Sequence, residues 1–457
     1  MKQKNTLNRR QFLSAATVAG TGALVSGSAV LTSCGGGESK TPKNVPIERL
    51  KAVRIPTLTD KAIDGKELKV GLVGCGGQGT GDVISMTRAA DGIKIIALGD
   101  VFENNLNEKR AQIKKDTGQE VPQENCFVGF DAYKKVIDSG VDVVLLVTPP
   151  VFRPLHFDYA VRAKKHVFME KPISVDVAGS LKLLATSKIA DSQGLCVVTG
   201  TQRRHQRSYV AAFKQVADGV IGEITGGNVY WNQNQLWYRN REKEWTDMEW
   251  MIRDWVNWAW LSGDHIVEQH VHNIDVFNWF CGLTPKSGIG FGSRQRRVTG
   301  DQYDMFSVDF EYENGIHMHS MCRQINRTTS NVSEFIQGTK GSLYLKDNHT
   351  AIIKDLAGTE IWKWDHEKEK EEFKQTNPYV LQFVDLVTAI REGKPFNETE
   401  ACANSSLMAV MGRESAYRGR TTTWENIKGT NMDFLPQEPK LENLDMTQYQ
   451  VPVPGGN

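Results

Sequence analysis

The sequence predicts an α/β protein in which a doubly wound parallel sheet is followed by an α+β domain with a large, mostly antiparallel open sheet. Over residues 67–200, short apolar runs alternate with stretches of helical spacing, a pattern typical of strand–helix–strand units. Beyond residue 200, strand-like runs follow one another more directly, which favours antiparallel pairing. The 457 residues suit two or three domains of about 150 residues each.

The N-terminal domain is expected to open with a buried strand over residues 68–73, a glycine-rich turn and a helix over 82–90. A second apolar strand at 93–98 ends at Gly99 and Asp100. The later elements are strands at 141–148, 166–169 and 195–199, with a helix at 157–163. This alternation predicts the doubly wound sheet of a nucleotide-binding domain.

The C-terminal domain is predicted to form one open sheet with helices over one face. Strands are expected at 225–231, 305–312, 316–321 and 334–337, and helices at 254–261, 267–280 and 379–392. We divide the chain into a signal (1–34), a linker (35–66), the N-terminal domain (67–200), a substrate and oligomerisation domain (201–430) and a surface-wrapping tail (431–457).

The composition is that of a water-soluble globular protein. Hydrophobic residues make up 40% of the chain and the mean hydropathy is −0.41, which excludes a multi-pass membrane protein. There are 55 Lys and Arg against 54 Asp and Glu, so the net charge of +1 creates no field that would attract nucleic acid. The six cysteines beyond Cys34 occur singly, without a C-x-x-C pair, which argues against structural zinc.

The turn after the first strand carries the motif G-x-G-x-x-G at residues 74–79. Gly74 permits a tight turn, Gly76 lets backbone N–H groups approach a pyrophosphate, and Gly79 allows a helix to pack closely on the strand. Gly77 and Gln78 complete the loop. A glycine-rich turn without a ligand is the alternative interpretation, but the motif's position between a strand and a helix favours a dinucleotide site.

Asp100 ends the second strand and supplies the acidic residue that such a site needs. Its carboxylate would accept hydrogen bonds from the adenosine ribose and would repel a 2′-phosphate. Residues 101–105 contain no Arg or Lys that could hold this phosphate. The predicted cofactor is therefore NAD rather than NADP.

Two further motifs resemble those of the Gfo/Idh/MocA family of sugar and polyol oxidoreductases: V-T-P-P at 147–150, and E-K-P at 170–172. Family-like features extend from about residue 69 to about residue 419 and imply an N-terminal Rossmann domain. The resemblance also implies that Lys171 lies beside the nicotinamide and the reacting alcohol. The other residues that it assigns to the cofactor are Thr148, Pro149, Pro150, His156 and Glu170.

This role suits the chemistry of a lysine. A positive nicotinamide ring disfavours a second positive charge nearby, so Lys171 could relay the hydroxyl proton as hydride leaves carbon. A surface lysine paired with Glu170 is the alternative.

The second motif of that family, D-x-G-x-H-x-x-D, corresponds to residues 268–275. Glu268 replaces the first aspartate, His270 replaces the glycine, and His272 matches the catalytic histidine. On one helix Glu268 and His272 would be i, i+4 neighbours, so the carboxylate could orient the imidazole as an acid/base group. The alternative for this pair is a buried structural salt bridge between Glu268 and His272. We assign His270 and Asp275 to substrate binding.

A metal site is a second alternative at this place, because His265, Glu268 and His272 would share one face of a helix. The order matches neither H-E-x-x-H nor H-x-x-E-H, and the family resemblance implies metal-free hydride transfer. We therefore predict no metal.

Arg203 and His205 follow the strand at 195–199, where polar groups commonly face the ligand crevice. They are candidates for hydrogen bonds to sugar hydroxyls. Ion pairs at the domain seam explain the same residues equally well.

Seven of the eleven tryptophans lie between residues 231 and 260. Indole rings pack well on the apolar faces of sugars, so we assign Trp231, Trp237 and the neighbouring Tyr238 to the substrate mouth. The tryptophans at 255, 258 and 260 have a spacing that suits core packing.

The first 34 residues resemble a twin-arginine export signal with a lipobox. Arg9 and Arg10 precede a mildly apolar run that ends at Cys34. Cleavage would leave Cys34 as a lipidated N-terminus, so we expect a periplasmic protein that contacts a membrane through this lipid only. A permanent membrane helix is the alternative, but the run is diluted by Gly, Ser and Thr.

These observations predict an NAD-dependent oxidoreductase that acts on a hydroxyl of a sugar or glycoside. No NAD pool is expected outside the cytoplasm, so the cofactor must stay bound and be reset by a second half-reaction. The second hypothesis is a redox-neutral glycoside hydrolase with a 3-keto intermediate, similar to the family's α-N-acetylgalactosaminidases. The third is a non-catalytic, lipid-anchored sugar-binding protein. By resemblance, the open sheet face is expected to pair subunits of a homo-oligomer.

Overall fold

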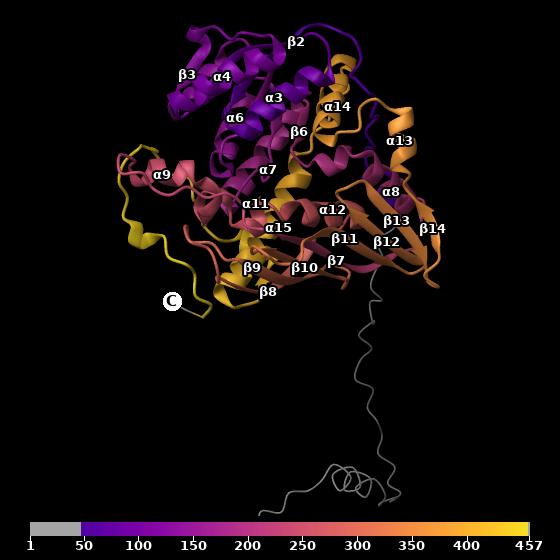
Figure 1. Ribbon diagram of the computed structural model, residues 1–457. Coiled ribbons are helices and arrows are strands. Elements are labelled where there is room, and N and C mark those ends of the chain that lie inside the picture. Colours follow the sequence, from indigo (N-terminus) through magenta and orange to yellow (C-terminus); the bar gives the residue numbers. More distant parts are fainter. Residues whose placement is uncertain (1–46, 456–457) are drawn as a thin grey trace, which may run out of the picture. The chain divides into compact units, whose positions relative to one another are not determined.

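The computed structural model describes residues 47–455 (Figure 1). The N-terminal half is an all-parallel sheet in the order β3-β2-β1-β4-β5-β6, which confirms the predicted doubly wound fold. The strands are β1 (Leu68–Val73), β2 (Ile93–Asp100), β3 (Cys126–Val128), β4 (Val143–Leu146), β5 (His166–Met169) and β6 (Val197–Thr199). They alternate with α3 (Gly77–Ala89), α4 (Glu103–Thr117), α5 (Ala132–Asp138), α6 (Arg153–Arg162) and α7 (Val177–Ser192).

The central strands of this sheet are mainly apolar because helices cover both faces. All four residues of β4 are buried, as are the last three of β5. The strand order reverses between β1 and β4, and at such a point the carboxyl ends of the strands leave a crevice for a ligand.

The C-terminal half contains a larger sheet in the order β14-β13-β12-β11-β7-β10-β9-β8-β15. The β7–β10 pair is parallel and the other pairs are antiparallel, as predicted. The strands are β7 (Ile224–Gln233), β8 (Pro285–Ser293), β9 (Met305–Tyr312), β10 (His317–Gln324), β11 (Asn331–Gly338), β12 (Gly341–Lys346), β13 (Thr350–Asp355), β14 (Glu360–Lys363) and β15 (Thr422–Thr423).

Burial alternates along β9 and β10, so one face of this sheet is covered and the other is more open. Helices α12 (Val271–Cys281) and α15 (Thr399–Arg418) lie on the covered face (Figure 1). The remaining helices of this half are α8 (Arg207–Ala217), α9 (Asp247–Arg253), α10 (Ala259–Ser262), α11 (His265–Glu268), α13 (His366–Glu372), α14 (Pro378–Glu392) and α16 (Trp424–Lys428).

Two predicted helices are broken in the structure. The helix expected at 254–261 is a 3₁₀ turn (Trp255–Asn257) followed by α10, which ends at Gly263 with a left-handed φ of 84°. The helix expected at 267–280 is split into α11 and α12. His270 lies at this break, and its buried ring reaches Ser320 of β10, with Nε2 2.7 Å from Oγ.

Segments from both ends of the chain pack against the N-terminal sheet. Helix α14 packs on α3, and α15 packs on α7. A bridge between Val197 and Asn397 extends β6. Residues 47–66 differ from the linker suggested by the sequence, because Leu50, Leu58 and Ala62 are buried. Chain segments outside the predicted 67–200 domain therefore complete the packing of the N-terminal half.

Within residues 47–455, no helix is both long and apolar enough to cross a membrane. The predicted export signal, with Arg9, Arg10 and Cys34, and the first part of the predicted linker lie outside the described residues.

Candidate active site

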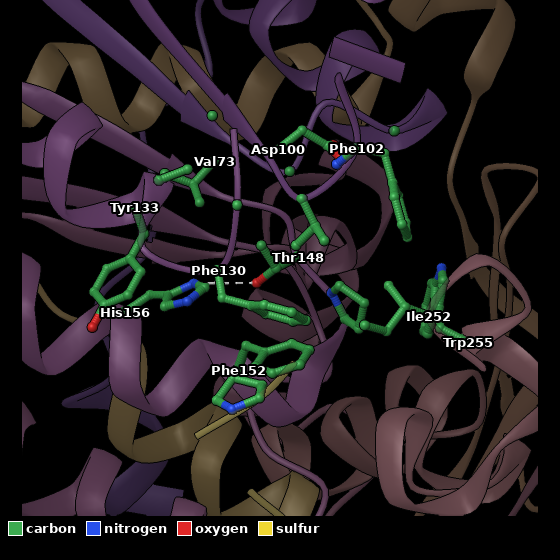
Figure 2. Close-up of a pocket in the computed structure, with 18 of the residues that line it drawn as sticks. Val73, Asp100, Phe102, Phe130, Tyr133, Thr148, Phe152, His156, Ile252 and Trp255 are labelled. Carbon is green, nitrogen blue, oxygen red and sulfur yellow. Dashed lines mark hydrogen bonds between the residues drawn. The ribbon is translucent and has the colours of Figure 1, made fainter. Parts of the chain in front are cut away.

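A cleft of about 1120 Å³ lies at the carboxyl ends of β1, β2 and β4. Figure 2 shows its aromatic walls, with Phe130 and Phe152 on one side and Trp255 on the other. The predicted site residues that line it are Gly74, Gly76, Gly77, Asp100, Thr148, Pro149, His156 and Trp237. The cleft thus lies at the place where a doubly wound sheet binds its ligand.

The glycine loop has the shape that a dinucleotide requires. Gly76 is the N-cap of α3, and no side chain caps the helix, so N–H groups of its first turn can meet an anion. A Cβ atom at Gly76 or Gly77 would meet nothing within 4 Å, so the backbone there faces open space. A Cβ at Gly79 would lie 2.1 Å from the oxygen of Gly74, so only glycine permits this approach.

Asp100 is held beside this loop at the end of β2. Its Oδ2 accepts hydrogen bonds from Cys75 N at 2.8 Å and Asn105 Nδ2 at 2.9 Å, and its Oδ1 accepts one from Phe102 N at 2.9 Å. Burial raises the pKa of Asp100, and these hydrogen bonds oppose the rise. A carboxylate offers about four acceptor positions, so one remains for a ribose hydroxyl.

His156 forms part of the cleft wall as a neutral ring. Burial lowers its pKa to about 3. The ring stacks on Tyr133 with centroids 4.2 Å apart, and Nδ1 lies 3.3 Å from Thr148 Oγ1 (Figure 2). The family-like motif after β4 is therefore a packed and uncharged surface.

Arg153 connects this wall to the E-K-P motif. Its Nε donates to the carbonyl of Thr148 at 2.8 Å, and one Nη donates to the carbonyls of Glu170 at 2.8 Å and Pro172 at 2.6 Å. The side chain is buried, which lowers its pKa to about 10. The loops after β4 and β5 are thus joined by one guanidinium.

Lys171 leaves the end of β5 and reaches α11 from the other half of the protein. Its Nζ lies 2.9 Å from the carbonyl oxygen of Glu268 and 3.2 Å from Glu268 Oε1. The Glu170 carboxylate accepts from the backbone N of Lys171 at 2.9 Å and from Gln78 Nε2 at 3.3 Å. Lys171 is therefore not a surface lysine paired with Glu170, and Glu170 instead links the lysine's backbone to the glycine loop.

His272 lies on α12 as a neutral imidazole. Burial lowers its pKa well below the usual value, and the charges of Lys171 and Arg203 add to this effect. Its ring stacks on Trp231 with centroids 5.3 Å apart, and Arg203 covers Trp231 at 5.3 Å. Among the described residues, Nδ1 of His272 has no hydrogen-bond partner.

The comparisons with known proteins agree with this geometry. Residues 68–201 match the model "Oxidoreductase family, NAD-binding Rossmann fold", and residues 209–344 match "GFO/IDH/MocA C-terminal domain". Together the two matches cover more than half of the chain. The chain belongs to the GFO/IDH/MocA oxidoreductase family.

Proteins similar to this chain carry different activities. The scyllo-inositol 2-dehydrogenase (NAD(+)) of Bacillus subtilis (strain 168) is 21% identical over 79% of this chain and 97% of its own. The alpha-N-acetylgalactosaminidase of Shewanella oneidensis is 23% identical over 68% of this chain and 70% of its own. The structure of Lactobacillus casei scyllo-inositol dehydrogenase with bound NAD(H) and scyllo-inositol covers 78% of this chain and 99% of its own, with 20% identity and a TM-score of 0.59, and so shows the shared fold.

One feature of the GFO/IDH/MocA motif at 268–275 differs from the sequence interpretation. The helix breaks between α11 and α12, so Glu268 and His272 do not lie on successive turns of one helix. Instead, the Glu268 carboxylate contacts Lys171 through Oε1 and Gln269 through Oε2. Glu268 therefore positions the lysine rather than the histidine.

Three residues assigned to substrate are buried in structural contacts. His205 lies between Asp385 and Glu398, with ring nitrogens 3.4 and 3.1 Å from their oxygens. His270 packs against β10. Asp275 accepts two hydrogen bonds from Arg204, at 2.8 and 2.9 Å. In this structure these side chains face the domain seam or the core, in line with the ion-pair alternative for His205.

The other four substrate candidates lie nearer to solvent or to the catalytic group. Arg203 forms an ion pair with Glu334 and covers Trp231, while Trp231 stacks on His272. Trp237 and Tyr238 are 46% and 47% exposed, and Trp237 lines the cleft. The tryptophan cluster is thus divided between the site and the core.

Three predicted cofactor residues do not line the cleft but contact or support residues of its loops. Gly79 packs on Gly74, Gln78 contacts Glu170, and Pro150 begins the buried 3₁₀ turn before α6. Within residues 47–455, the residues close enough to share a metal ion are His349, His366 and Glu369, and none belongs to the alternative metal site at 265, 268 and 272.

Sequence reasoning missed two contributors to the site. Arg153 bridges two loops, and no motif marks such a role. Residues 433 and 435–440 of the C-terminal tail line the cleft, although they are distant in sequence from every cofactor motif. Only the folded chain brings these groups together.

Proposed function

We propose that the protein is an NAD-dependent oxidoreductase that acts on a hydroxyl of a sugar, polyol or glycoside and keeps its cofactor bound between turnovers. The observation that carries the proposal is the position of Lys171. Its ammonium is held by Glu268 at the carboxyl end of β5, the sheet edge that also bears the glycine loop, and its charge acts on His272. The family membership and the inositol dehydrogenase relative support this choice of substrate class.

The residues divide the chemistry of alcohol oxidation between them. NAD⁺ held by the glycine loop and Asp100 would supply the hydride acceptor for the carbinol carbon. Lys171 Nζ has three N–H donors. Two of them donate to the carbonyl oxygen and Oε1 of Glu268, and the third remains for the substrate oxygen. The neutral His272, whose Nδ1 is unpartnered among the described residues, accepts the hydroxyl proton in this proposal. Lys171 then acts as a fixed cation that stabilises the negative charge on the oxygen, and not as the proton relay suggested by the sequence.

The decisive variant is Lys171→Met, which keeps the volume of the stem and removes the charge. Nucleotide content, measured on the denatured protein, should be unchanged because the glycine loop and Asp100, which recognise the dinucleotide, stay intact. Turnover should fall by about 10³-fold or more. Lys182→Met on the exposed surface of α7 is the matched control. An active Lys171→Met protein would refute the assignment.

The substrate is tested with the protein purified without added cofactor and incubated with a panel of polyols and glycosides. Mass analysis that finds a product lighter by two hydrogens supports oxidation. Release of the aglycone without net oxidation supports the second candidate, a redox-neutral glycoside hydrolase, which is favoured by the Shewanella oneidensis relative. A protein without nucleotide and without turnover would be the sugar-binding protein of the third hypothesis.

We also propose that the protein is exported by the twin-arginine route and anchored through lipidated Cys34, as its first 34 residues suggest. This compartment makes cofactor retention necessary, because no NAD pool is expected there. A homo-oligomer paired through the open sheet face is supported by Ile289 and Phe291 of β8, which are 43% and 70% exposed. Light scattering of the purified protein would measure the subunit number.

A further inference from the structure

The C-terminal tail forms part of the wall of the coenzyme cleft. Residues 433 and 435–440 lie in the cleft wall together with Asp100, Phe102 and Asn105, the loop that would face the adenosine ribose. In Figure 1 this yellow segment runs beside α9 before it reaches the C-terminus. We call residues 433–440 the strap.

The strap is anchored at its first end to the Rossmann half. The carbonyl oxygen of Met432 accepts a hydrogen bond from Ala178 N at 2.9 Å. Phe434 N donates to Asp176 Oδ2 at 2.6 Å. Asp176 is also the N-cap of α7 and accepts from Gly179 N at 2.8 Å, so this anchor is built into the start of a helix.

A second anchor holds the chain to the C-terminal half. Met248 N donates to the carbonyl oxygen of Glu442 at 3.1 Å, and Leu444 N donates to Asp247 Oδ2 at 3.1 Å. Beyond this point Tyr449 packs against Trp258 and Trp260, with ring centroids 6.1 and 6.5 Å apart. The strap is thus fixed at both ends, to two different halves of the protein.

Between the anchors the strap bonds to itself. Leu435 N donates to Asp433 Oδ1 at 3.1 Å, and Glu442 N donates to Lys440 O at 2.9 Å. Pro436 and Pro439 restrict the backbone and have no N–H to pair with a neighbouring strand. The middle of the strap is therefore a stiff span in the cleft wall, with Gln437, Glu438 and Lys440 exposed.

We propose that the strap is the outer wall of the adenosine half of the dinucleotide site and holds NAD(H) in the protein between turnovers. This inference rests on the proposed function. A dinucleotide seated on the glycine loop and Asp100 can leave through the cleft mouth only after the strap moves, which requires an anchor to open or the proline-stiffened span to bend. The strap lowers the dissociation rate of the cofactor, whereas the glycine loop and Asp100 supply its recognition.

The test cuts the strap in the folded holoenzyme. Gln437→Ile, Pro439→Gly and Lys440→Arg, around the native Glu438, create a factor Xa site inside the strap. The matched control, Leu356→Ile, Ala357→Glu and Thr359→Arg around the native Gly358, creates the same site in the exposed β13–β14 turn. Dissociation is followed as the loss of bound NADH fluorescence after a chase with excess NAD⁺, before and after cleavage.

Cleavage of the strap should raise the dissociation rate about tenfold or more, and cleavage of the control should leave it unchanged. An unchanged rate after the strap is cut would overturn the inference and leave the proposed function intact. A wild-type protein that binds no NADH would overturn the proposed function and the inference with it. If cutting unfolds the protein, Pro436→Gly with Pro439→Gly decides, because a loosened but continuous strap should also release NADH faster.

Discussion

His205 shows at the scale of one residue how a polar side chain at a strand end can serve the fold rather than the substrate. Its ring is buried between Asp385 of α14 and Glu398 before α15, and Arg54 from the N-terminal segment makes a bidentate pair with the same Asp385 at 2.6 and 2.7 Å. Burial opposes the charge on His205, but the carboxylates of Glu398 and Asp385 outweigh it and raise its pKa to about 9. Three chain segments therefore meet at one imidazolium.

Because of His205, the free energy of unfolding of the protein should decrease as the pH rises. A pKa raised from 6.5 to about 9 contributes stability that is fully present below pH 6.5 and is lost as the pH passes through about 9. The shift corresponds to roughly 3 kcal/mol. Urea unfolding at pH 6.5 and pH 9 measures the loss, and His205→Gln should flatten the difference. The same pH dependence in the variant would contradict the role of His205.

At the scale of one element, α3 depends on where its glycines lie. Gly79 faces the glycine loop, with no room for a Cβ, whereas Gly81 is exposed on the same helix and a Cβ there would meet nothing within 4 Å. The N-terminus of α3 can approach the dinucleotide only because the first of these positions lacks a side chain.

This contrast predicts opposite effects of one substitution at two positions. Gly79→Ala should destabilise the protein by about 2 kcal/mol or more and weaken NAD binding, because helix and loop must separate. Gly81→Ala should stabilise it by about 1 kcal/mol, since alanine is the better helix former, and leave NAD binding unchanged. Urea unfolding and quenching of tryptophan fluorescence by NAD measure both quantities. Equal effects at the two positions would show that the close approach at Gly79 is unimportant.

At the scale of the whole molecule, the Rossmann half is completed by chain from both ends. Residues 47–66, α14 and α15 pack against it, and the strap lines its cleft. Such a protein holds its cofactor site together only when the complete chain is folded. This suits a route that exports folded proteins, in which a cofactor can be loaded beforehand.

The export proposal predicts two separable effects. Arg9→Lys with Arg10→Lys should leave the protein in the cytoplasm with its nucleotide bound. Cys34→Ala should still be exported but should appear in the soluble periplasmic fraction, because no lipid holds it to the membrane. Cell fractionation with immunoblotting measures both. Normal export of the double Lys variant would exclude the twin-arginine route.

Much of the fold followed from local patterns. The sequence predicts β1, β5 and β9 with the boundaries found in the structure, because each is a short run with a clear burial pattern. It does not predict the break between α11 and α12. A side chain such as His270 can divert a helix by binding a distant strand, and no local spacing shows that contact.

The family and the NAD-binding loop could be read from the sequence alone, which also predicts Lys171 and His272 as the proton-handling residues, because these are properties of short motifs and of backbone geometry within a few residues. Only the packing of distant segments shows that Glu268 contacts Lys171, that His205 lies between two carboxylates, and that the tail lines the cleft. The physical reason is that a buried charge takes whatever partner the packing of distant segments brings to it. Its partner is thus set by the fold as a whole and not by spacing along the chain.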